Sequence, residues 1–219
     1  NVLEPVKLTR DFPVSPLGIE KQIWKDVTAV YEGFEGGHIY RYNPKTGDAK
    51  PYTSEDQCPL EDLGIPVAKN TIYAMTFNPD RTRIYGLTYP DAHFFVFDLA
   101  SRQAKDLGEF LEHKVYSGPE RHWRSIPRAL YCDPKTGDVY TSGDNGIVLR
   151  YRPGAEKLEF TGMRLPGEYW EGLSSFDYPV VESFDTDSDG NLYAGTNDGY
   201  LIRLDLKDEE TIVLGKPRI

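Results

Sequence analysis

Short runs of alternating apolar and polar residues follow one another along the chain, separated by clusters of Gly, Asn, Asp and Pro. A clear example is TIYAMTF (71–77), which is followed by the turn-like NPDRTR and then by IYGLTYP (84–90). Alternation with a period of two, together with many β-branched and aromatic residues, predicts strands with two different faces. Helical periodicity is nearly absent. The pattern therefore predicts an all-β fold.

The predicted strands are organised in four repeats, each with four short strands, which we name A to D in chain order. The third repeat contains VYTSG, DNG and IVLRY, and the fourth contains LYAGT, NDG and YLIRLDL at the same places. Four marker tyrosines, Tyr31, Tyr85, Tyr140 and Tyr193, stand at one position of each repeat, by subtraction 54, 55 and 53 residues apart. A recurring unit of four antiparallel strands is typical of a β-propeller blade. We predict an N-terminal extension over 1–18 and a propeller over 19–219, with blades at about 19–53, 71–110, 127–161 and 180–215.

Four blades leave the size of the ring open. The chain could close as a four-bladed propeller, pair into a larger ring, or form part of a chain with seven or eight blades. It begins at Asn1 rather than Met, which we interpret as a processed form or a piece of a longer protein. An open half-propeller exposes a sheet edge that invites pairing. Another propeller half or a protein subunit is therefore an expected partner.

Composition narrows the function classes. The formal net charge is -10, which disfavours a general role on nucleic acid or on an anionic membrane because the whole-molecule field repels phosphate. No apolar run approaches the roughly 18 residues of a membrane span, so we expect no membrane insertion. Cys58 and Cys132 match no zinc or redox spacing, and we expect two free thiols, which leave the redox compartment open.

One stretch, FDTDSDGNLY (184–193), has the opening spacing of a calcium loop. Asp185, Asp187 and Asp189 occupy the first three ligand positions, and Gly190 follows. Position 12 of such a loop should be a bidentate Glu, but it is Thr196 here. The third repeat has DPKTGDVY at the same place, which cannot hold calcium. We therefore predict an ordinary A–B turn, with calcium as the weaker alternative and no other cofactor.

The connections from each D strand to the next A strand are long, roughly 54–70, 111–126 and 162–180, and share one rim with the B–C turns. Long connections on one rim usually mark a binding face. His38 and His93 open the C strands of the first two blades, where the other blades have Ile147 and Tyr200. The candidate site residues on this rim are His38, His93, His113, Tyr116, Arg121, His122, Trp123, Arg124, Tyr169 and Trp170.

This inventory suits an acidic sugar. Exposed aromatic rings stack on sugar rings, Arg pairs with a carboxylate, and His transfers protons near neutral pH. β-Elimination at a uronate needs that combination. Each residue also has a structural interpretation, since a His at a strand start is often a satisfied structural residue. RHWR, with Trp123, could stack on a neighbouring blade with Arg paired to Glu, and EYWEG, with Trp170, could pack within its loop.

The stretches YPDAHFFVFDL (89–99) and GPERHWRSIPRAL (118–130), with His113 between them, resemble bacterial β-propeller polysaccharide lyases of the ulvan lyase type. The resemblance covers the second and third blades. It implies a seven-bladed propeller that cleaves a sulfated uronate polysaccharide by β-elimination, with His, Tyr and Arg on one rim. His93 and His113 look like the histidine pair of that family. The candidates for its Tyr and Arg are Tyr116, Tyr178, Arg124 and Arg164.

Three functions therefore stay open. The first is a polysaccharide lyase in which His93 and His113 handle protons, with Tyr116 as a further candidate. Arg124 or Arg121 would neutralise the carboxylate, and the remaining rim residues would bind the sugar. The second is a non-catalytic propeller that binds a glycan or protein, and the third is an assembly module of a larger complex. We expect a secreted or periplasmic location.

Overall fold

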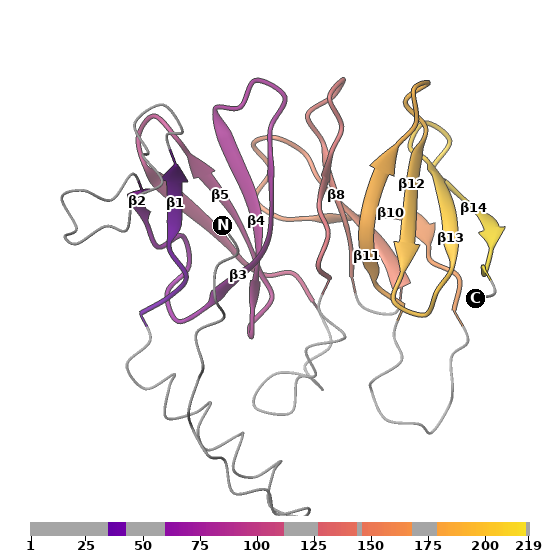
Figure 1. Cartoon of the computed structure of the whole chain (residues 1–219), viewed down its shortest axis with the longest axis horizontal. Coiled ribbons are helices and arrows are strands. Elements are labelled where there is room, and N and C mark those ends of the chain that lie inside the picture. Colours follow the sequence, from indigo (N-terminus) through magenta and orange to yellow (C-terminus); the bar gives the residue numbers. More distant parts are fainter. Residues whose placement is uncertain (1–34, 43–59, 112–126, 144–145, 168–178, 218–219) are drawn as a thin grey trace, which may run out of the picture. The chain divides into compact units, whose positions relative to one another are not determined.

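The predicted alternating runs form strands in the computed structural model, which describes residues 35–42, 60–111, 127–143, 146–167 and 179–217 (Figure 1). All of these belong to one of two compact units of the chain, Glu35–Ile219. None of the helices in the described residues is long and apolar enough to cross a membrane. The strands are β1 (Ile39–Tyr42), β2 (Leu60–Gly64), β3 (Thr71–Phe77), β4 (Arg83–Tyr89), β5 (His93–Asp98), β6 (Gln103–Glu109), β7 (Tyr131–Cys132), β8 (Val139–Ser142), β9 (Ile147–Tyr151), β10 (Glu159–Arg164), β11 (Val181–Thr186), β12 (Leu192–Thr196), β13 (Leu201–Asp205) and β14 (Glu210–Gly215).

Three four-stranded antiparallel sheets follow the predicted repeats. β3 to β6, β7 to β10 and β11 to β14 each pair in chain order, so every sheet is a simple meander. These sheets are the second, third and fourth blades, and they confirm the all-β propeller architecture. In the described residues, the first blade is represented by the two-stranded pair of β1 and β2. β1 is the predicted C strand of that blade.

The D strand of the first blade differs from the prediction. β2 pairs with β1, with Tyr42 opposite Leu60 and Ile39 opposite Gly64. It therefore lies inside the stretch 54–70 that was predicted as a long connection, and only residues 65–70 separate it from β3. The sequence LEDLG has two acidic residues and little alternation, so its strand character depends on its partner β1. The stretch predicted as the D strand, 49–53, lies outside the described residues.

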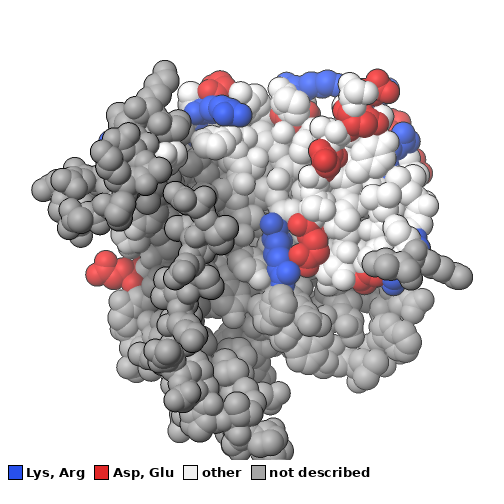
Figure 2. Space-filling model, in the orientation of Figure 1, with Lys and Arg blue, Asp and Glu red and all other residues white. Residues whose placement is uncertain are grey.

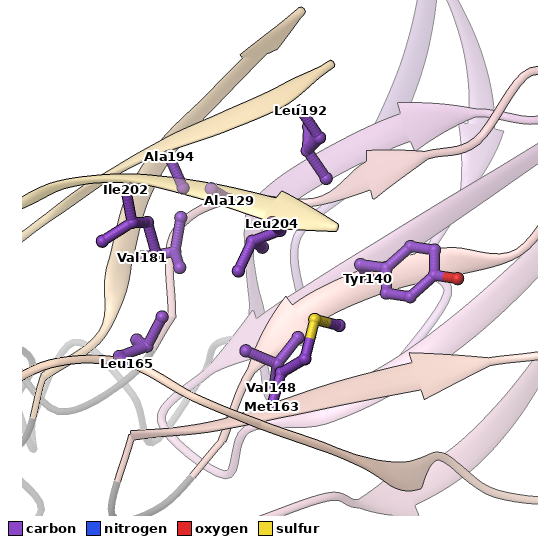
Figure 3. Packing of buried hydrophobic residues seen from close by; sticks show 10 residues of the cluster. All are labelled: Ala129, Tyr140, Val148, Met163, Leu165, Val181, Leu192, Ala194, Ile202 and Leu204. Carbon is purple, nitrogen blue, oxygen red and sulfur yellow. The ribbon is translucent and has the colours of Figure 1, made fainter. Parts of the chain in front are cut away.

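Apolar side chains fill each junction between consecutive blades. β5 is buried on both faces: Phe94 joins a cluster with the third blade, whereas Phe95 and Phe97 join a cluster with β1 and β2. Figure 3 shows the junction of the third and fourth blades, where side chains from the two sheets point toward one another. Its buried members are Ala129, Tyr140, Val148, Met163, Leu165, Val181, Leu192, Ala194, Ile202 and Leu204. Blades are thus held to their neighbours by hydrophobic burial, as in other repeat architectures.

The meander topology separates two edges of the blades. The A–B and C–D turns lie on one edge, which we call the turn edge. The B–C turns and the connections between blades lie on the other, which we call the link edge. On the face shown in Figure 2, acidic and basic side chains gather along the turn edge. Of the residues predicted to carry function, His38, His93 and Arg164 are described, and they lie at or next to strand ends on the link edge.

Candidate functional site

Of the predicted catalytic and sugar-binding residues, His38, His93 and Arg164 fall within the described part of the chain. Arg164 ends β10, and its guanidinium group lies over the Phe160 ring, 5.2 Å from the centroid. The roles of the others therefore stay predictions. The predicted residues outside the described part are His113, Tyr116, Arg121, His122, Trp123, Arg124, Tyr169, Trp170 and Tyr178.

His93 is fixed by a carboxylate from the neighbouring D strand. Its Nδ1 lies 2.9 Å from Oδ2 of Asp106 on β6. Oδ1 of Asp106 accepts a hydrogen bond of 2.8 Å from the backbone N–H of Gly108. Gly108 has a φ of 81°, a conformation that glycine adopts without strain. The bulged end of β6 therefore holds the carboxylate in place, and the carboxylate orients the imidazole.

His38 repeats this arrangement in the first blade. Its Nδ1 lies 2.7 Å from Oδ2 of Asp62, whose Oδ1 accepts a 2.9 Å hydrogen bond from the backbone N–H of Gly64. The hydrogen bond from His38 and then that from Gly64 hold the pKa of Asp62 below its usual range. The ring of His38 also stacks on Tyr40, with the centroids 5.8 Å apart. The equivalence of the two histidines, inferred from the repeat, thus extends to a shared His–Asp–Gly unit.

A buried polar network sets the position of His93. Oγ1 of Thr88 accepts a 3.0 Å hydrogen bond from the backbone N–H of His93 and donates one of 3.1 Å to Oδ1 of Asn70. The same Asn70 oxygen accepts a 3.0 Å hydrogen bond from the backbone N–H of Asp91. In the fourth blade, the backbone N–H of Tyr200 donates to Oγ1 of Thr196 at 3.0 Å. Tyr200 therefore stands where His93 does, as the repeat predicted, whereas the sequence did not single out Asn70 or Thr88.

A second cluster, unforeseen from the sequence, joins three blades at the link edge. Nε of Arg128 donates to the hydroxyl of Tyr73 at 3.1 Å, and Nη1 donates to Oε2 of Glu182 at 3.1 Å. The guanidinium group also lies over the Tyr73 ring, 5.6 Å from its centroid. All three side chains are partly exposed. This is a cation held by a phenol and a carboxylate from the blades on either side.

The register explains why these three residues meet. Tyr73 and Glu182 lie near the start of the A strands β3 and β11, and Arg128 lies three residues before the A strand β7. Each stands five residues before the Asn or Asp that opens its A–B turn, which is Asn78, Asp133 or Asp187. Counting back from the turns was the sequence signal that could have found this cluster.

The turn edge carries a cleft of about 710 Å³ between the third and fourth blades. Its walls include cations and anions, such as Arg150, Lys135, Asp138 and Asp205, so its chemistry favours no single charge. Burial raises the pKa of Asp138, and burial raises that of Cys132 to about 11 with help from nearby Asp133 and Asp138. Cys132 is therefore protonated at neutral pH and is a poor nucleophile.

The suspected calcium loop forms a turn that satisfies its own carboxylate. Asp187 accepts hydrogen bonds from the backbone N–H groups of Asp189 and Asn191, at 3.0 and 2.9 Å. It also accepts from the Asn191 side chain at 2.7 Å and from the Tyr193 hydroxyl at 3.0 Å. In addition, Oδ1 of Asp185 accepts from the backbone N–H of Thr186. Within the described ranges, no group of three or more His, Cys, Asp or Glu side chains is arranged to hold a metal ion. The geometry supports the turn interpretation.

Comparison with known proteins identifies the fold only. No protein-family model and no curated protein matches the chain. Among solved structures, the hydrazine synthase of Kuenenia stuttgartiensis matches with a TM-score of 0.52 at 12% identity, over 81% of this chain and 43% of that one. The C-terminal WD40 domain of Sif2 gives 0.46 at 12% identity, over 66% and 34%. A protein of unknown function from Bacteroides thetaiotaomicron gives 0.44 at 17% identity, over 70% and 35%.

The chain therefore spans less than half of each of these three structures. Together with the repeated meanders, the likeness to the hydrazine synthase structure, at a TM-score of 0.52, identifies the described sheets as blades of a β-propeller. At these identities it carries no information on activity. None of the three is described as a polysaccharide lyase.

Proposed function

We propose that this propeller binds an acidic polysaccharide at its link edge and cleaves it by β-elimination. The observation that carries the proposal is the imidazole of His93, whose Nδ1 lies 2.9 Å from the Asp106 carboxylate at that edge. A carboxylate that accepts the proton of one ring nitrogen fixes the tautomer and leaves the other nitrogen as a proton acceptor. Nε2 of His93 would then be the atom that takes the proton.

A cation beside the uronate carboxylate is the second requirement. Arg128 supports this part of the proposal because its guanidinium group is held at the same edge by Tyr73 and Glu182. Arg121 and Arg124, just before it in the sequence, are the other candidates. A guanidinium group pairs bidentately with a carboxylate and stabilises the negative charge that develops on it.

The proposed reaction balances without a cofactor. Nε2 of His93 takes the proton from the carbon next to the carboxylate, and the released electron pair forms a carbon–carbon double bond. The bond from the adjacent carbon to the glycosidic oxygen breaks, and that oxygen receives a proton from His113 or Tyr116. The products are an unsaturated uronate and a shortened polysaccharide.

The test is an assay on sulfated and non-sulfated uronate polysaccharides that follows the ultraviolet absorbance of the unsaturated product. His93→Gln should lower kcat by about 100-fold or more, the range that general acid–base catalysis contributes. His38→Gln is the matched control, because His38 has equivalent partners, Asp62 and Gly64, in the first blade. This variant should affect KM more than kcat. Equal kcat for wild type and His93→Gln would contradict the assignment.

A non-catalytic glycan-binding propeller is the second candidate, and the repetition of the His–Asp–Gly unit favours it. A catalytic residue needs one copy, whereas a brace between the C and D strands would recur from blade to blade. On this hypothesis, calorimetric titration with the same polysaccharides gives saturable binding and the absorbance assay gives no product. His38→Gln and His93→Gln would then lower stability to a similar extent.

A further inference from the structure

The last blade has an uncovered face at a position that is buried in every other blade. That position is defined by its partner on the neighbouring B strand, which is the residue two places after the marker tyrosine of the same blade. Phe94, Val148 and Leu201 each pair with that residue in the second, third and fourth blades. Ile39 holds this place in the first blade by the repeat spacing. Ile39, Phe94 and Val148 are at most 2% exposed, because each packs against the next blade, whereas Leu201 is 40% exposed.

The marker tyrosines show the same difference. Tyr85 and Tyr140 are buried against the third and fourth blades, respectively. Tyr193 is only partly buried, and its neighbour across the sheet is Arg203. The face of the fourth blade that carries Tyr193, Leu201 and Arg203, which we call the trailing face, is therefore built like a blade junction, but no sheet of the described residues packs on it.

The first blade has an exposed face on its other side, the side that in later blades packs against the preceding blade. Tyr40 and Tyr42, one and three places after Ile39, are 57% and 54% exposed. In the later blades these places are buried, and all of their residues except Leu149 belong to a cluster shared with the preceding blade. The buried equivalents of Tyr40 are Phe95, Leu149 and Ile202, and those of Tyr42 are Phe97, Tyr151 and Leu204. We call the face with Tyr40 and Tyr42 the leading face.

The trailing and leading faces carry the same kinds of residue that meet at an existing blade junction. At the junction of the second and third blades, the ring of Tyr151 lies 5.0 Å from that of Phe94 and 5.6 Å from that of Tyr85, between centroids. Leu201 and Tyr193 hold the places of Phe94 and Tyr85, and Tyr42 holds the place of Tyr151. A trailing face set against a leading face would therefore reproduce an existing junction.

Ion pairs also connect consecutive blades. At each described junction, a residue from the C–D turn of one blade forms an ion pair with the preceding blade. Arg102 pairs with Glu61, Glu156 with Lys105 at 2.9 Å, and Glu209 with Arg150 at 3.1 Å.

Arg203 lies opposite Tyr193 as Arg150 lies opposite Tyr140. A blade on the trailing face should therefore bring an acidic C–D connection to Arg203.

We infer that a second copy of this chain covers both faces. The fourth blade of each copy packs on the first blade of the other, and two copies of four repeats close one ring of eight blades. Eight blades lie within the range of closed propellers, and a two-fold axis relates the two new junctions. A second copy fits because one chain carries one face of each kind, so each copy supplies what the other needs. This inference does not depend on the proposed enzymatic activity.

Disulfide trapping of the Tyr42→Cys/Leu201→Cys double variant tests the inference. Both side chains are about half exposed, so the variant should fold, which a thermal melt of the reduced protein verifies. Mild oxidation should join most of the protein into a species of twice 24.9 kDa on a non-reducing gel. Reductant should reverse the link, and neither single variant should form it.

Two results would overturn the inference. A disulfide within one chain would mean that its four blades close on themselves, and no disulfide would mean that another partner covers the faces or that they stay open. Met75→Cys/Leu201→Cys is the matched control, because Met75 is 51% exposed on β3 and belongs to neither face. Should the double variant not fold, Arg203→Glu is the alternative: it should raise the dissociation constant of the dimer at least tenfold, and an unchanged constant would equally contradict the inference.

Discussion

Phe94 and Leu201 occupy the same place in two blades of one chain, and their surroundings differ completely. Phe94 is buried between the second and third blades, whereas Leu201 is 40% exposed on the trailing face of the last described blade. Both follow from the same alternating strand pattern. The comparison teaches that a repeat determines which face of a strand is apolar, while the next repeat determines whether that face is covered.

The largest expected effect is at the covered member of this pair. Phe94→Ala should lower the free energy of unfolding by about 3–5 kcal/mol, because it leaves a cavity among Tyr85, Leu87 and Tyr151. In dilute protein, Leu201→Ala should lower it by less than about 1 kcal/mol, since the side chain is already partly in water. Urea unfolding of both variants measures the difference. Equal losses would show that Leu201 is buried in the isolated chain.

The two arginines give the next contrast. Arg150 pairs with Glu159 at 2.8 Å and with Glu209 at 3.1 Å, and its side chain is only 14% exposed. Arg150→Met should lower the free energy of unfolding by about 2 kcal/mol, because it leaves the two glutamates without their shared cation. Arg203→Met should be close to neutral in dilute protein. A cost for Arg203→Met that grows with protein concentration would sharpen the case for a partner on the trailing face.

Substitutions in the A–B turns should have effects that do not depend on whether the blade is covered by a neighbour, because the polar groups of each turn form hydrogen bonds within the turn itself. Asp187→Ala should lower the melting temperature by a few degrees, since four donors lose their acceptor. Asp185→Ala should lower it less, because fewer contacts depend on that carboxylate. Differential scanning calorimetry measures both. Adding calcium or EDTA should leave the wild-type melting temperature unchanged, and a rise with calcium would contradict the turn interpretation.

The smallest effects concern pH. Hydrogen bonds hold the pKa values of Asp62, Asp98 and Asp187 below their usual range. Their stabilising contribution is therefore present near neutral pH and is lost as the pH falls below about 4. Burial raises the pKa of Asp138, which has the opposite sign, so this carboxyl disfavours folding at neutral pH.

Asp138→Asn places there the residue type that the fourth blade has at Asn191, and it should raise stability at pH 7 but not at pH 3. Urea unfolding between these pH values tests both signs. Wild-type stability that rises toward pH 3 would contradict the sign for Asp62, Asp98 and Asp187. An Asp138→Asn variant no more stable than the wild type at pH 7 would contradict the sign for Asp138.

The sequence allowed the prediction of everything that repeats locally. The all-β class, the blades and the equivalence of His93 with Tyr200 follow from spacing, and the turn at Asp187 follows from comparison with its counterpart in the third blade. β2 was missed because LEDLG becomes a strand only through pairing with distant β1. Asp62 and Asp106 were missed as histidine partners because only the sheet register places them beside His38 and His93.

The cluster of Tyr73, Arg128 and Glu182 was missed for a related reason. Each residue is unremarkable within its own repeat, and its partners are 54 or 55 residues away in the chain. Contacts between repeats depend on how blades pack, which local patterning does not determine. The remaining predicted site residues, His113 and Trp170 among them, lie outside the described residues and stay predictions.

The mass of the wild-type chain in solution tests the central claim most directly. Multi-angle light scattering at micromolar concentration should give twice 24.9 kDa, with no larger species, because two copies leave no uncovered blade face. A stable mass of 24.9 kDa, or a series of ever larger assemblies, would contradict a closed ring of two copies.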